Sequence, residues 1–156
     1  MINITDFETV KNNGVEYYKS LAEVYCPYFK EKILFNARGL EHLKFKRPDK
    51  PRAPEDQYMR FKLLYLAPQI INDSHTLQGV LETKCFERIR VHNRTDTVLK
   101  PVNYFEFIAV IKRNRVRVII KQIDSNEKFF WSLIPYWSMN KVTMTRILHE
   151  DAPEES

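Results

Sequence analysis

The spacing of apolar residues changes along this chain, and the change constrains the fold more than any other feature. In the first half, apolar residues recur near every 3.6 positions, as expected for helices that bury one side. From Phe86 onward they alternate with polar residues, which is the pattern of strands with one buried face. We therefore expect an α+β fold, with N-terminal helices packed on one face of a four-stranded antiparallel meander sheet.

The first half predicts a series of helices separated by prolines and polar residues. A capping-box pattern at Thr5 predicts the first helix, which should run until Cys26, the residue before a proline. Asn36 should cap a short second helix that ends at residues 41–43. Further along we expect an exposed basic loop at 46–54, a helix from Glu55 to about Leu66, a kink or restart at Pro68 and a stop at 72–74.

The second half predicts four strands, the last three joined by short polar turns at 112–114 and 124–127. The strands are expected at Phe86–His92, Tyr104–Ile111, Arg115–Ile123 and Lys128–Ile134. A short helix is predicted at 140–149, so that residues 1–149 form one domain and 150–156 an acidic, disordered tail.

Composition narrows the class of protein. The N-terminus lacks a signal-peptide pattern and every apolar stretch is too short to cross a bilayer, which predicts a cytoplasmic protein without a membrane partner. Cys26 and Cys85 lack further ligands at metal spacing, so we expect free thiols and neither metal nor cofactor. No glycine-rich phosphate loop or nucleophile-elbow motif occurs, which disfavours nucleoside-triphosphate and serine-hydrolase chemistry.

The net charge of +5 is concentrated in two segments. Residues 44–52 hold five cations and one acid, and residues 112–121 hold five cations and no acid, whereas the tail at 150–156 carries four acids. Such clustering favours a polyanionic partner. An equally weighted alternative is that both segments are simply solvated.

Strand alternation sorts the side chains of the predicted sheet onto two faces. Val116, Val118 and Ile120 share the apolar face of their strand. If the polar faces of the strands coincide, one surface gathers Arg88, Arg90, His92, Glu106, Arg117, Lys121 and Ser132. A plain wet face of an antiparallel sheet would look similar.

This set of side chains suits metal-independent RNA cleavage. A base must take the proton of the 2′-hydroxyl, an acid must protonate the 5′-oxygen, and cations must stabilise the charged phosphorane. Histidine and glutamate can move protons, while arginine and lysine hold phosphate by charge-assisted hydrogen bonds.

Three stretches of the chain carry a resemblance to a known group. Leu40–Leu43, Leu66–Asn72 and Lys128–Pro135 resemble short motifs of the barnase–EndoU–colicin–RelE superfamily of metal-independent ribonucleases, in particular its small phage- and mobile-element-associated members. The resemblance spans about residues 33–137 and implies helices first, then a sheet that carries the RNA. Lys46 and Arg47 stand where these proteins usually have a second histidine.

The leading hypothesis is therefore a toxin-like or defence-related endoribonuclease that leaves 2′,3′-cyclic phosphate ends. Its partners would be RNA and an acidic inhibitor or antitoxin protein. The alternatives are a non-catalytic nucleic-acid-binding module and a protein-interaction domain that uses the same sheet. The candidate catalytic residues are His42, Glu106, His92, Lys121 and Ser132, and the candidate phosphate-binding residues are Arg88, Arg90, Arg115, Arg117, Lys46 and Arg47.

Overall fold

A six-stranded sheet runs through residues 3–135, the part of the chain that this computed structural model describes. Its last four strands are antiparallel neighbours in chain order, so the predicted meander is present, but the sheet has six strands rather than four. The predicted helix at 140–149 and the tail at 150–156 lie outside the described residues. In the sheet order β1-β2-β8-β7-β6-β5, the strands are β1 (Glu23–Cys26), β2 (Glu31–Leu34), β8 (Phe129–Pro135), β7 (Asn114–Ile123), β6 (Arg94–Ile111) and β5 (Gly79–Val91).

The first helix is shorter than its sequence pattern predicted. Helix α1 (Ile4–Leu21) is capped by Asn3, whose side chain accepts a hydrogen bond from the Thr5 amide at 2.8 Å. It ends at Ala22, which has a positive φ of 55°. The expected continuation to Cys26 is wrong because 23–26 and 31–34 pair as a hairpin that buries Cys26 and Ile33.

The remaining helices lie close to their predicted positions. Asn36 caps α2 (Ala37–Lys44), as expected, by accepting the Gly39 amide hydrogen bond at 3.2 Å. The helices α3 (Pro54–Leu63) and α4 (Leu66–Asp73) follow, but the break between them falls at residues 64–65 and not at Pro68, which lies in the first turn of α4. The segment predicted as an extended loop forms a small two-stranded ribbon of β3 (Phe45–Arg47) and β4 (Lys50–Pro51).

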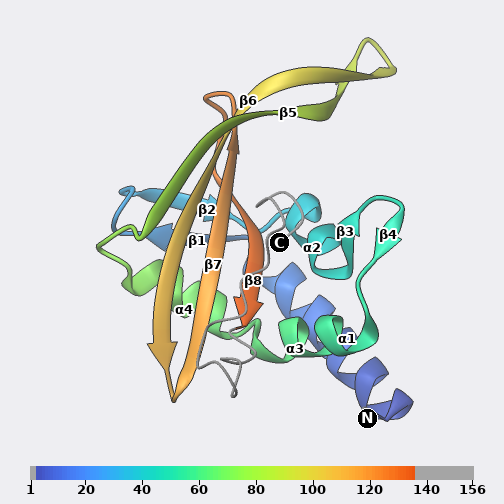
Figure 1. The fold of residues 1–156 in the computed structure, drawn as a ribbon, viewed down its shortest axis with the longest axis vertical. Coiled ribbons are helices and arrows are strands. Elements are labelled where there is room, and N and C mark those ends of the chain that lie inside the picture. Colours follow the sequence, from blue (N-terminus) through green and yellow to red (C-terminus); the bar gives the residue numbers. More distant parts are fainter. Residues whose placement is uncertain (1–2, 136–156) are drawn as a thin grey trace, which may run out of the picture.

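All four helices contribute buried apolar side chains to one core cluster on a single face of the sheet, as expected. Helix α4 packs on this face, hereafter the α4 face, against β1, β6 and β7. Helices α2 and α3 contact β8 and lie at its side, beyond the point where β2 stops (Figure 1). Strand β2 pairs with β8 only at Leu34 and Phe129, so the rest of that edge of β8 is left for α2.

A bulge in β8 changes which side chains appear on the other face of the sheet, hereafter the opposite face. Ile119 pairs with Ser132, whereas the next residue, Ile120, pairs with Phe130. Trp131 is therefore an extra residue, and it joins the apolar cluster of the opposite face instead of the α4 core.

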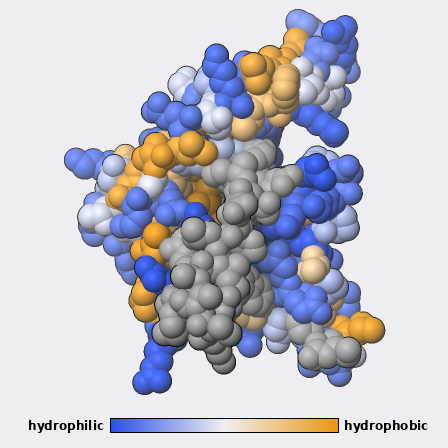
Figure 2. All heavy atoms as spheres, viewed as in Figure 1, coloured by the Kyte–Doolittle hydropathy of each residue, from blue (hydrophilic) through white to orange (hydrophobic). Residues whose placement is uncertain are grey.

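The β5–β6 hairpin extends well beyond the rest of the sheet. Strand β7 pairs with β6 only over 102–111, while β5 and β6 remain paired out to Val91 and Arg94. Residues 84–101 thus form a two-stranded arm, closed by a turn in which His92 and Asn93 have φ of 49° and 65°. The arm projects from the body in Figure 1, and Figure 2 shows hydrophobic surface on it between hydrophilic stretches.

The contact between α2 and β8 makes Gly39 a sensitive position. A Cβ there would lie 2.3 Å from the Phe130 carbonyl oxygen and 2.4 Å from the Tyr18 hydroxyl. Although alanine favours a helix interior by about 1 kcal/mol, we expect Gly39→Ala to lower the free energy of unfolding by about 2 kcal/mol, because the backbone oxygen cannot move aside cheaply. Urea denaturation measures the change.

Gly79→Ala is the matched control, since its nearest new contact is the Glu106 Cβ at an ordinary 3.4 Å. It should stay within about 1 kcal/mol of wild type. Equal stability of Gly39→Ala and wild type would show that α2 does not press on β8.

Candidate functional site

Buried polar side chains from distant parts of the chain meet around Trp131. They come from the end of α2, from α3 and the residues before it, and from β5, β7 and β8. Buried charged groups in proteins are nearly always paired, and each of these has an ion-pair or hydrogen-bond partner. The buried polar residues in contact with Trp131 or with one another are His42, Arg52, Arg60, Glu87, Lys121 and Ser132.

His42 is held by stacking and by an arginine. Its ring stacks on the Trp131 indole with centroids 3.9 Å apart and planes 16° apart. Its Nε2 lies 3.0 Å from an Nη2 of Arg52, whose Nε donates to the His42 carbonyl at 2.8 Å. A guanidinium has only donors, so this contact needs a lone pair on Nε2 and therefore a neutral ring with its proton on Nδ1.

Arg52, Asp56 and Arg60 form a line of charges at intervals of four residues. Asp56 accepts from Arg52 at 3.4 Å and from the Nε of Arg60 at 2.6 Å. Arg60 in turn donates to the Ser132 hydroxyl oxygen at 2.7 Å. Burial lowers the pKa of Arg60, and Asp56 offsets part of that effect. The line therefore connects His42, at one end, to the hydroxyl of Ser132 at the other.

Lys121 is the second buried cation beside the indole. Its Nζ lies 4.1 Å from the Trp131 ring centroid and 5.6 Å from that of Tyr104. It forms an ion pair with Glu87 at 2.7 Å, and Glu87 also accepts from Arg38 at 3.0 Å. Burial lowers the pKa of Lys121, and Glu87 offsets part of that effect.

Glu106 lies on the same face of the sheet but is engaged elsewhere. The pairing of Glu106 with Ile119, and of Ile119 with Ser132, sets the backbones of Glu106 and Ser132 two strand spacings apart, or about 10 Å. The Glu106 carboxylate accepts from Nε of Arg117 at 2.8 Å and also from its Nη2. This pair forms a second, separate charged unit beside the cluster at Trp131.

The structure brings together some of the predicted site residues and separates others. His42 and Lys121 contact the Trp131 ring, and Ser132 is connected to His42 through Arg60, Asp56 and Arg52. Glu106 and Arg117 lie nearby on the same face of the sheet. His92 lies in the turn of the arm, Arg115 is an exposed residue of β7, and Lys46 and Arg47 belong to the β3 ribbon.

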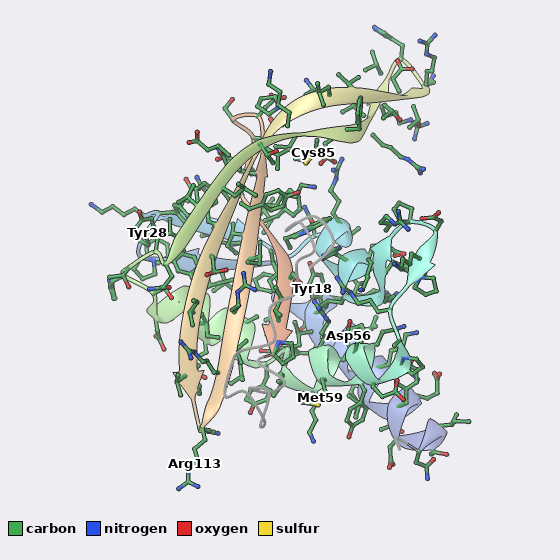
Figure 3. All side chains as sticks on the ribbon, in the orientation of Figure 1. Tyr18, Tyr28, Asp56, Met59, Cys85 and Arg113 are labelled. Atoms are coloured by element: carbon green, nitrogen blue, oxygen red, sulfur yellow. The ribbon has the colours of Figure 1, made fainter. Side chains whose placement is uncertain are left out.

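Arg88 and Arg90 require a correction, because they do not share the face of Lys121. Glu87 is the β5 residue that contacts Lys121, and alternation turns its neighbour Arg88, and with it Arg90, to the other side. Cys85 lies two residues before Glu87 and therefore on the same face of β5. Figure 3 shows its side chain directed from the arm toward the body. A buried lysine on the opposite face needs a carboxylate there, and Glu87 provides it.

Several members of the site were missed in the sequence. The prolines of residues 46–54 predict an exposed loop, yet Arg52 within it is only 3% exposed. The spacing of four between Arg52, Asp56 and Arg60 was a usable signal, because such positions share one side of a helix. Trp131 gave no signal, since its placement depends on a bulge that the apolar run of β8 does not mark.

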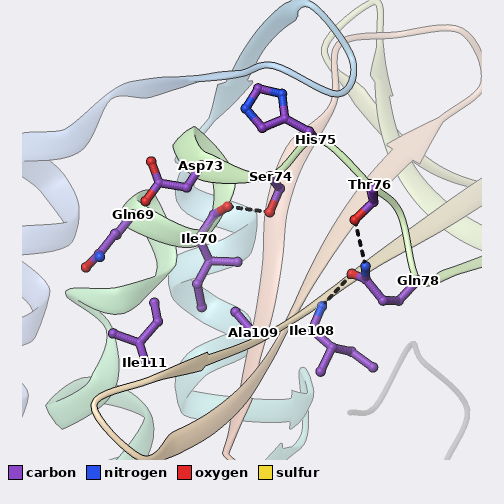
Figure 4. Close-up of a pocket in the computed structure, with 10 residues that line it drawn as sticks. All are labelled: Gln69, Ile70, Asp73, Ser74, His75, Thr76, Gln78, Ile108, Ala109 and Ile111. Carbon is purple, nitrogen blue, oxygen red and sulfur yellow. Dashed lines mark hydrogen bonds between the residues drawn. The ribbon is translucent and has the colours of Figure 1, made fainter.

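A separate groove of about 280 Å³ lies between α4 and β6 (Figure 4). Asp73, Ser74 and His75 line it, but the Ser74 hydroxyl donates to the Ile70 carbonyl at 2.5 Å. The His75 ring is directed away from that hydroxyl in Figure 4. The groove therefore has the residue types of a hydrolase but not their geometry.

Within residues 3–135, no three or more His, Cys, Asp or Glu side chains gather in a way that could hold a metal ion. No helix in this part of the chain is long and apolar enough to span a membrane. Comparison of the chain with protein-family models, with curated proteins and with solved structures found no match.

The ion pair of Lys121 and Glu87 predicts a dependence between two substitutions. Lys121→Met should lower the free energy of unfolding by about 3 kcal/mol, because Glu87 stays buried with only Arg38 as a described partner. Adding Glu87→Gln should restore at least half of the loss, since the uncompensated buried charge is removed. Urea denaturation of both single variants and the double variant measures the coupling. Strictly additive losses would contradict it.

The lowered pKa of Lys121 also predicts a pH dependence. The unfolded chain holds this proton up to the usual value of 10.5, whereas the folded chain releases it earlier. Between those two pKa values the unfolded state binds more protons, so the stability of wild type should rise with pH relative to Lys121→Met. Stability measured at intervals from pH 7 to 10 tests this. A constant difference would show that the lysine is not perturbed.

Proposed function

We propose that this chain is a metal-independent endoribonuclease that uses the cluster around Trp131. The observation that carries the proposal is that a histidine and a lysine contact one buried indole, while two arginines and an aspartate link the histidine to a buried hydroxyl. These are the groups that RNA transesterification needs, namely a proton acceptor, a proton donor and charge to stabilise the phosphorane.

The resemblance to the barnase–EndoU–colicin–RelE superfamily supports the same reading. Two of its three short stretches supply members of the cluster: Leu40–Leu43 contains His42, and Lys128–Pro135 contains Trp131 and Ser132. These two stretches lie side by side in the fold, where the His42 and Trp131 rings stack with centroids 3.9 Å apart.

His42 is the candidate base in this proposal. Its ring is neutral in the arrangement described above, which is the form that can accept the proton of a 2′-hydroxyl. Arg52 uses the lone pair of Nε2, so a bound phosphate must draw the guanidinium away before the ring can act. Arginine prefers a phosphate to a neutral nitrogen, since charge-assisted hydrogen bonds are stronger.

Lys121 is the candidate acid. An ordinary lysine is a poor proton donor at neutral pH, but burial lowers the pKa of Lys121 toward the useful range. Donation to the departing 5′-oxygen would replace the second histidine that this chain lacks. Arg60 would hold a phosphate oxygen, and Ser132, which Arg60 contacts, would orient the same group. Glu106 is a weaker candidate because Arg117 engages its carboxylate.

The burial of the cluster adds a requirement to the mechanism. His42 is 4% exposed, Lys121 1% and Ser132 0%, so RNA reaches them only after the site opens. Turnover is therefore limited by opening as well as by chemistry. A toxin-like or defence-related enzyme with an acidic inhibitor protein fits this behaviour, since cations exposed on opening would attract acidic side chains.

A non-catalytic RNA-binding module is the second candidate. The contact between Arg52 and Nε2 of His42 favours it, because the lone pair needed for catalysis is occupied. A protein-interaction domain on the same sheet is the third.

The test is cleavage of labelled RNA under single-turnover conditions, with excess protein and EDTA. Wild type should leave 2′,3′-cyclic phosphate ends, and His42→Ala should slow cleavage about 100-fold because the proton acceptor is lost. His75→Ala, which changes a histidine away from the cluster, should cleave as wild type does.

Thermal melting of both variants establishes that they fold. Unchanged cleavage by folded His42→Ala contradicts the assignment of the base. No cleavage by wild type, together with binding that weakens steeply in salt, supports the non-catalytic module.

A further inference from the structure

The outward side of the β5–β6 arm carries cations around an exposed aromatic ring. Alternation gives the arm two faces: an inner face with Cys85, Glu87 and Ile89, and an outer face made by the even positions of β5 and the odd positions of β6. The outer face consists of Lys84, Phe86, Arg88, Arg90, Thr95, Thr97 and Leu99, all of which are exposed.

Charge is divided unequally between these two faces. The acids of the arm, Glu87 and Asp96, are both on the inner face, where Glu87 pairs with Lys121 and Asp96 with Arg94. The outer face holds cations only. Within residues 3–135, the side chains of Lys84, Arg88 and Arg90 have neither an ion pair nor a hydrogen bond. Their charge is thus available to an external ligand.

Phe86 distinguishes this surface from an ordinary solvated strand. It is 73% exposed, and its cross-strand partner Leu99 is 49% exposed, so neither contributes to a core. A bare ring between Lys84 and Arg88, with about 7 Å between successive outward side chains, is a platform on which an unpaired base can stack while the cations meet neighbouring phosphates.

The arm is also fixed to the helix that carries His42. Arg38 of α2 donates to the Glu87 carboxylate at 3.0 Å and to the Arg88 carbonyl at 3.1 Å. A two-stranded ribbon is weakly stable by itself, and this double contact holds it against the body. A ligand on the outer face is therefore kept at a set distance from the cluster at Trp131.

We propose that the outer face of the arm binds single-stranded RNA, with Lys84, Arg88 and Arg90 on phosphates and Phe86 stacked on a base. The inference rests on the proposed ribonuclease function and adds a second contact surface, away from the site of cleavage, that holds the flanking part of the substrate. Single-stranded RNA is specified because a duplex hides the base faces that Phe86 would need.

The probe is a labelled single-stranded 2′-O-methyl RNA of mixed sequence, which binds but cannot be cleaved because its attacking hydroxyl is blocked. Affinity is measured against salt concentration for wild type, for Arg88→Gln/Arg90→Gln and for Phe86→Ala. The matched control is Lys112→Gln/Arg113→Gln, which removes the same charge from the exposed turn before β7, at the other end of the sheet (Figure 3).

The arm variant should lower the slope of log affinity against log salt by about 1.4, since each lost phosphate contact on a single strand is worth about 0.7. Phe86→Ala should weaken binding roughly tenfold without changing that slope. The control should leave the slope within error of wild type.

Equal slopes for the arm variant and the control overturn the proposal, as does the absence of measurable binding by wild type at low salt. If duplex RNA binds more tightly than single-stranded RNA and Phe86→Ala does not change its affinity, the proposal is overturned too. The open edge of β5 would then be a surface to which a strand of another protein could add. Failure of the ribonuclease proposal is seen separately: wild type would bind the 2′-O-methyl RNA through the arm yet leave ordinary RNA uncut.

Discussion

The close approach of α2 to β8 is the contact on which the rest of the structure depends. Gly39 lets the helix backbone come within reach of the Phe130 carbonyl, and Tyr18 closes the gap by donating to the Asn36 carbonyl at 2.6 Å. This approach brings the last turn of α2, and therefore His42, over the indole of Trp131. A larger residue at position 39 would separate the two elements and with them the two halves of the site.

The second requirement is that the buried positive charges of the cluster are neutralised. Arg52, Arg60 and Lys121 are nearly inaccessible to solvent, and burying three cations is costly unless carboxylates accompany them. Asp56 serves the two arginines and Glu87 serves the lysine. Glu87 comes from the arm, so the hairpin that extends beyond the sheet also takes part in neutralising the interior. Such networks are rarely the most stable way to fill a core, and buried charged groups with shifted pKa values gather at functional sites.

Much of the fold was predictable from the sequence because it depends on local patterns. Alternation located the four strands of the meander, although β5 begins seven residues and β6 ten residues before the predicted starts, and Asn36 located the start of α2. The strands β1 and β2 could not be found in this way, since segments of four residues are too short to establish a period. The site was partly predictable: His42, Lys121 and Ser132 were identified by residue type. The face predicted for Arg88 is wrong because the sequence does not show which side chains of β5 share a face with those of β7. The contact between Glu87 and Lys121 decides this in the folded chain.

The order of the sheet has a consequence for how the chain is made. Strand β8 comes last among the described strands, but it lies between β2 and β7, and it touches α2 and α3. While the chain is being synthesised, β1 and β2 can pair with each other, but the other edge of β2 has no partner strand until residues 129–135 have left the ribosome. The indole, the hydroxyl and the strand that carry the site arrive together at that moment. A chain that ends before residue 129 therefore holds His42 and Arg52 without the Trp131 ring and the Ser132 hydroxyl, so the cluster cannot be completed until the last described strand has been made.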